Sequence, residues 1–82
     1  MLDVTEAPIA ALLAMVLNGG APPRARLGLP TDAPHEACRK RYLALALRLH
    51  PDKTSDARAA EAFTALEAAF HSIEAAERVA TG

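Results

Sequence analysis

One proline, Pro51, constrains this chain strongly, because it interrupts a stretch of apolar side chains with helical spacing. Before it, such side chains recur every three or four residues: Cys38, Tyr42, Leu45 and Leu49. After it, the same spacing returns in Phe63, Leu66, Phe70 and Ile73. Proline lacks a backbone N–H and restricts the preceding residue, so a helix should end near His50 and a loop should follow. A short connection between amphipathic helices favours an antiparallel hairpin, at about residues 35–50 and 56–74.

Composition also favours an all-α fold. Twenty of the 82 residues are alanine, and β-branched residues are few. Only about a quarter of the side chains are large and apolar, too few for a β-sandwich or a doubly wound sheet in so short a chain. The single cysteine, Cys38, excludes a disulfide framework and a cysteine-cluster zinc site, and it fits a reducing compartment, which we expect to be the cytoplasm.

The first part of the chain predicts an additional apolar helix at about residues 6–17, ended by Asn18-Gly19-Gly20. No charge occurs over residues 7–18, so this helix should be buried. Acidic residues precede it, which argues against a signal peptide, and its length of roughly 14 Å is about half a bilayer core. We therefore expect no membrane span.

Capping residues place the other helix ends. A short first helix or turn is expected near residues 23–28, before Pro30. Asp32 is the expected N-cap of the first hairpin helix, and Ser55 or Asp56 is the expected N-cap of the second.

Two leucines of the first hairpin helix, Leu43 and Leu47, lie well away from its core stripe on a helical wheel and should form an exposed pair. An uncharged helix and an uncovered apolar patch in one short chain suggest that the two meet. We predict that four N-terminal side chains cover this pair: Ile9, Leu12, Leu13 and Val16.

Charge is unevenly distributed, although the net charge is only −1. Residues 35–53 hold five Lys and Arg against two acidic residues, whereas residues 54–82 hold two against five. The hairpin should therefore pair a basic helix with an acidic one and present a cationic outer face.

The loop motif His50-Pro51-Asp52-Lys53 joins these two helices, and its flanks carry a family pattern. Tyr42, Leu45, Ala46, Leu47, Arg48 and His50 match Tyr-x-x-Leu-Ala-Leu-Lys-x-His, and Leu27-Gly28-Leu29 matches Leu-Gly-Val. Glu61-Ala62-Phe63 and residues 66–70 match the apolar register of the family's next helix. In these features, over about residues 23–74, the chain resembles a J domain, the DnaJ-type co-chaperone module.

The resemblance implies that the chain docks on a DnaK-type heat-shock ATPase and stimulates its ATP hydrolysis. It implies no enzymatic activity, no cofactor and no metal in this chain. It assigns chaperone binding to His50, Pro51 and Asp52, beside Lys53, and to the basic positions Arg39, Lys40 and Arg48. Arg41 is an additional charge on the same side of the helix as Arg48, and we include it in the expected docking site.

The resemblance also shows departures. Leu43 and Ala44 stand where the family usually has basic residues, which weakens the cationic face. We expect residues 1–22 to form the apolar helix and a Gly/Pro linker, and residues 23–82 to form the J domain, with the family's fourth helix absent or degenerate.

Several other functions fit the residues less well. A helix-turn-helix bound to nucleic acid would need a basic second helix, but here the basic helix comes first. His35 and Cys38 have the spacing of two metal ligands, yet Cys38 belongs to the core stripe. A catalytic pair of His50 and Asp52 lacks a nucleophile and a pocket.

One alternative stays open. The chain could keep the fold but act as an interaction adaptor that stimulates ATP hydrolysis weakly or not at all. Such an adaptor would bind a further protein through the N-terminal helix or through Leu43 and Leu47.

Overall fold

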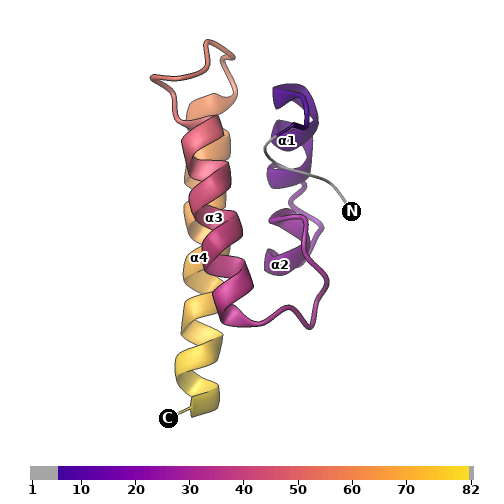
Figure 1. Cartoon of the computed structure of the whole chain (residues 1–82), viewed down its shortest axis with the longest axis vertical. Coiled ribbons are helices and arrows are strands. Elements are labelled where there is room, and N and C mark those ends of the chain that lie inside the picture. The colour runs from indigo at the N-terminus through magenta and orange to yellow at the C-terminus, as the bar shows by residue number, and fades with distance from the viewer. Residues whose placement is uncertain (1–5, 82) are drawn as a thin grey trace.

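The computed structural model describes residues 6–81, with side chains through Arg78, and these residues form four α-helices (Figure 1). They are α1 (Ile9–Val16), α2 (Pro23–Arg26), α3 (His35–Leu49) and α4 (Ala59–Thr81). α3 and α4 pack as an antiparallel hairpin, and α1 and α2 follow one another along one side of it (Figure 1). The predicted all-α hairpin is therefore confirmed.

The helix ends differ from the expected ones where proline sets the backbone. α1 begins at Ile9 rather than near Glu6, because Pro8 is extended (φ −64°, ψ 146°) at the N-cap. The expectation that Asp32 caps α3 is wrong, since Pro34 occupies the N-cap with an extended backbone and no side-chain hydrogen bond is made there. The amide of Cys38 donates to the carbonyl of Pro34 at 3.1 Å instead.

α4 begins later and ends later than the expected 56–74. Asp56 does accept a hydrogen bond from the amide of Arg58 (2.9 Å), but this bond closes a turn before the helix. At the other end, the alanine-rich segment after Glu74 keeps helical geometry through Thr81, as its high helix propensity favours.

The end of α2 shows why Leu27-Gly28-Leu29 is a helix-closing motif. Gly28 has a positive φ of 78°, which L side chains rarely adopt. Its amide donates to the carbonyl of Ala25 (2.9 Å), and the amide of Leu29 donates to the carbonyl of Arg24 (3.0 Å). This pair of bonds is a Schellman motif, and it confirms the short first helix near residues 23–28.

The core lies between the hairpin and the α1–α2 layer. Its largest fully buried side chains come from all parts of the fold: Leu12, Leu13, Val16, Leu27, Cys38, Leu45, Leu49, Leu66 and Ile73. Tyr42 is partly buried, and its ring stacks on Phe70 with centroids 4.4 Å apart. Burial, followed by the nearby carboxylates Glu67 and Glu74, raises the pKa of Tyr42 above its ordinary value. The two apolar stripes thus face the core as their spacing predicts, except for Phe63, which lies outside the core cluster.

The predicted partner of the N-terminal helix is wrong. α1 packs against α3 and α4 on the core side, where Leu12, Leu13 and Val16 are completely buried. Leu43 and Leu47 remain 50% and 66% exposed. The hairpin alone leaves part of its core stripes exposed to water. When α1 covers this larger apolar surface, the fold is stabilised more than it would be if α1 covered two leucines on the outer face.

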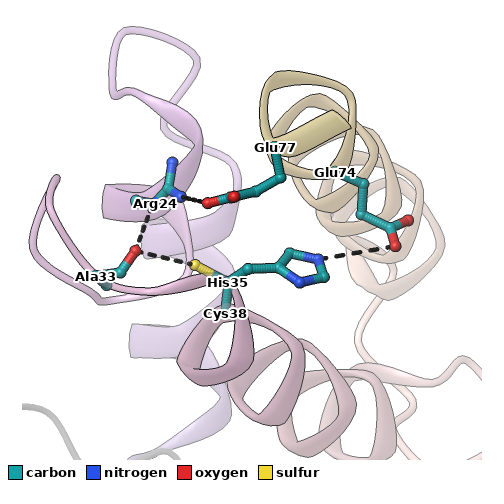
Figure 2. A network of polar contacts seen from close by, with 6 residues as sticks. All are labelled: Arg24, Ala33, His35, Cys38, Glu74 and Glu77. Carbon is teal, nitrogen blue, oxygen red and sulfur yellow. Dashed lines mark hydrogen bonds and ion pairs between the residues drawn. The ribbon is translucent and has the colours of Figure 1, made fainter. Parts of the chain in front are cut away.

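The end of the hairpin opposite the loop is held by Arg24 of α2 (Figure 2). Its Nε donates to the carbonyl of Ala33 at 2.8 Å, and its Nη2 lies 3.3 Å from Oε1 of Glu77 on α4. The Sγ of Cys38 lies 4.0 Å from the same Ala33 carbonyl. Only 20% of the Arg24 side chain is exposed. Through these contacts Arg24 joins three elements: α2 itself, the loop that precedes α3, and α4.

Replacing Arg24 with methionine keeps an apolar stem but removes both polar contacts. We expect the free energy of unfolding to fall by about 1–3 kcal/mol, because partly buried partners lose a charged donor. Urea unfolding followed by circular dichroism measures the change. Arg39→Met on the exposed face of α3 is the matched control, with an expected change within about 0.5 kcal/mol. Equal effects of the two substitutions would contradict this role of Arg24.

Candidate functional site

The loop between α3 and α4 holds His50 and Asp52 in a hydrogen-bonded turn. His50 leaves the helix with an extended backbone (φ −59°, ψ 132°), as the following proline requires. Its carbonyl accepts hydrogen bonds from the amides of Lys53 (2.8 Å) and Thr54 (3.2 Å). The amide of Asp52 donates to Nδ1 of the His50 ring at 3.1 Å. The turn is therefore fixed by bonds to both the backbone and the side chain of His50.

The two polar side chains of this turn differ in exposure. The His50 ring meets Phe63 of α4 edge to face, with centroids 5.4 Å apart and 46% of its side chain exposed. The Asp52 side chain is 90% exposed, and its Oδ2 lies 3.7 Å from Nδ1 of His50. Because Nδ1 accepts the Asp52 amide bond, a neutral ring in this geometry has its proton on Nε2, which then points a donor away from the turn's own bonds. The site thus offers one imidazole donor and one carboxylate acceptor side by side.

At the end of the loop that leads into α4, hydrogen bonds between Asp56 and Arg58 form a brace. Two guanidinium nitrogens of Arg58, Nε and Nη2, each lie 3.3 Å from an oxygen of Asp56. Side-chain and backbone hydrogen bonds from Arg58 lower the pKa of Asp56. A lowered carboxyl pKa means that this brace is present at neutral pH and is lost only as the pH falls through the lowered value.

An apolar groove adjoins the turn on the outer side of the hairpin. Its volume is about 500 Å³, and it is lined by Leu43, Ala46, Leu47, His50, Asp52, Lys53 and Phe63. The expectation that Leu43 and Leu47 are exposed is confirmed. The prediction that Phe63 belongs to the core stripe is wrong: Phe63 is half-buried, lies outside the core cluster and lines this groove. The position of Phe63 in the sequence, close to the loop and near the start of α4, could have indicated that it lies near His50.

The basic residues of α3 divide into two pairs. Arg39 and Lys40 are exposed, and Nζ of Lys40 lies 3.6 Å from Oε1 of Glu36. Arg41 is half-buried and its Nη1 donates to the carbonyl of Leu27 at 3.5 Å. Arg48 is also half-buried and donates to the carbonyl of Ala7, before α1. The structure therefore does not present the four cations as one face, and their part in docking stays a prediction.

Comparison with protein families matches residues 25–80 to the DnaJ domain, and these residues include the end of α2, all of α3 and nearly all of α4. This chain belongs to the DnaJ domain family. Comparisons with curated proteins and with solved structures gave no match. The four helices and the α3–α4 packing agree with the J-domain fold. α1 lies before the matched residues, and the division of the chain at residue 22 stays a prediction.

Membership of the J-domain family decides two further expectations. J-domain proteins are co-chaperones of DnaK-type chaperones and are not enzymes, so the expected partner class and the absence of enzymatic activity hold for this chain. Across residues 6–81, no helix has the length and hydropathy needed to cross a membrane.

The other functional interpretations find little support in the geometry. α3 and α4 lie antiparallel along their lengths, unlike the crossed helices of a helix-turn-helix (Figure 1). In the described part of the chain, no three His, Cys, Asp or Glu side chains are grouped as metal ligands would be. His35 instead has its Nε2 3.8 Å from Glu74 (Figure 2). Its ring stacks on Phe70, and Cys38 is buried.

Proposed function

We propose that this J domain docks on a DnaK-type chaperone through His50, Pro51, Asp52 and the outer face of α3, and stimulates the chaperone's ATP hydrolysis. The observation that carries the proposal is the position of the tripeptide. It forms a turn, exposed at Pro51 and Asp52, at one end of the α3–α4 hairpin, in a chain whose family membership is shown.

The hydrogen bonds of the turn support a binding role. Pro51 fixes its own φ, and the bonds to His50 hold the neighbouring residues, so little conformational freedom is lost on binding. Asp52 can accept charge-assisted hydrogen bonds from an arginine of the partner, and the Nε2–H of His50 can donate one. Arg39, Lys40 and Lys53 are exposed and can steer an acidic partner surface.

This chain would supply no reacting group. The chemistry would belong to the ATP site of the partner, and the J domain would act by binding the hydrolysis-competent state more tightly than the resting state. Its effect on the rate is then limited by that difference in affinity.

Single-turnover ATP hydrolysis by purified DnaK-type chaperones, one bacterial and one eukaryotic, tests the proposal. The wild-type chain should accelerate hydrolysis, and Asp52→Asn should reduce the acceleration at least about tenfold, a change of ~1.4 kcal/mol in transition-state free energy. Asp32→Asn, an equal change of charge at another exposed position, is the control and should act like the wild type. No acceleration by the wild-type chain at any concentration would refute the proposal.

The adaptor function remains a second candidate because of one observation, the exposure of Leu43 and Leu47. Its other expected route, through the N-terminal helix, stays a prediction: Leu12, Leu13 and Val16 of α1 are buried in the core, so a partner could reach only the opposite face of that helix. The adaptor interpretation predicts that a partner binds at the two leucines while ATP hydrolysis is unchanged.

A further inference from the structure

We infer that apolar contact, rather than charge, provides most of the docking affinity of this J domain. The apolar groove, lined chiefly by Leu43, Ala46, Leu47 and Phe63, receives an aliphatic segment of the DnaK-type chaperone. This inference rests on the proposed function and specifies the chemistry of the partner surface.

The first support is the use of the cations within the fold. Arg41 and Arg48 donate to backbone carbonyls of the layer formed by α1 and α2, so moving them to a partner would break contacts of the folded chain. Lys40 lies beside Glu36, whose carboxylate offsets its charge. Exposed charges of this kind contribute little affinity and are screened by salt.

The second support is the apolar surface beside the turn. Leu43 and Leu47 are the large apolar side chains exposed among the described residues, at 50% and 66%. Together with Ala46 and Phe63 they line a groove of about 500 Å³, large enough for aliphatic side chains. Covering half-exposed leucines removes apolar area from water, which is the main source of affinity at the centre of an interface.

The groove is also continuous with the proposed docking turn. His50, Asp52 and Lys53 line the same groove, so whatever fills it also lies against the proposed docking turn. A symmetric pair of these chains fits less well, because two copies facing each other through α3 would bring their exposed cations Arg39 and Lys40 to one interface. The occupant that fits is therefore an aliphatic segment of the chaperone rather than a second copy of this chain.

The test measures the concentration of chain that gives half-maximal stimulation of single-turnover hydrolysis by the same purified chaperones. Leu43→Asn and Leu47→Asn should each raise this concentration about tenfold or more, as expected for lost leucine burial. Ala68→Asn, on an exposed position of α4, should leave it unchanged. The double variant Arg39→Ala/Lys40→Ala should raise it no more than about threefold.

Salt provides an independent measurement. For the wild type, half-saturation should change less than about threefold between about 0.05 and about 0.5 M NaCl, because screening acts on exposed charges. Leu43→Lys should make the same quantity salt-dependent. Circular dichroism checks that every variant keeps its helices, which we expect because the substituted side chains are exposed.

The outcomes separate this inference from the proposed function. Stimulation that falls steeply with salt and is unaffected at Leu43 and Leu47 would overturn the inference and leave the function standing. No stimulation by the wild-type chain would refute the function, and the inference with it. A wild-type dimer that dissociates in Leu47→Asn, seen by sedimentation, would assign the groove to a second copy and overturn the inference.

Discussion

His50→Gln is expected to remove nearly all stimulation of the chaperone's ATP hydrolysis. The imidazole accepts the Asp52 amide bond, contacts the ring of Phe63 and keeps an Nε2–H as a donor. Glutamine is flexible and cannot make these three contacts in one geometry. We expect at least about a tenfold loss in the stimulated single-turnover rate, equivalent to ~1.4 kcal/mol.

His71→Gln is the matched control for this substitution. His71 is exposed on α4, so the same chemical change away from the turn should leave stimulation and stability unchanged. His50→Gln should also retain the helical circular dichroism of the wild type, because His50 lies beyond the end of α3. A fully active His50→Gln chain would contradict the role given to the turn.

Removing the leucines of α1 is expected to have the largest effect on stability. Leu13→Ala should lower the free energy of unfolding by about 2–5 kcal/mol, because the side chain is completely buried. A domain of this length has a total stability of roughly 4–12 kcal/mol. We therefore expect the double variant Leu12→Ala/Leu13→Ala to be largely unfolded at room temperature, as urea titration and circular dichroism will measure.

Leu47→Ala is the control, since it makes the same chemical change on a side chain that is 66% exposed. Its effect should stay within about 0.5 kcal/mol. A similar loss at Leu13 and Leu47 would mean that α1 does not belong to the core.

Local patterns in the sequence were enough to predict the hairpin. The stripes ending in Leu49 and Ile73 follow helical spacing, and Pro51 forces the chain out of the helix after His50. The position of the candidate site follows from these features, because a turn between antiparallel helices lies at the end of the hairpin. Gly28 closes α2 for an equally local reason, its positive φ.

Features that depend on distant parts of the chain could not be predicted. The apolar face of α1 fits any uncovered apolar surface, and its spacing does not say whether it will meet Leu43 or Leu45. Similarly, Arg41 and Arg48 resemble solvent-exposed cations in the sequence, but they donate to carbonyls that only the folded chain brings near. Phe63 likewise follows the helical spacing of a core residue, but in the folded chain it contacts the His50 ring and lines the groove, and the sequence alone does not show this contact.

The most direct test of the account is to map the surface that the chaperone covers. Amide chemical shifts of the isotope-labelled chain can be recorded while an ATP-bound DnaK-type chaperone is added. Docking through the turn and the groove should give the largest changes at residues 39–53, including Leu43, Leu47 and Asp52, with α1 and the end of α4 unchanged. Changes confined to α1 or to the end of α4, with His50 and Asp52 unaffected, would contradict it.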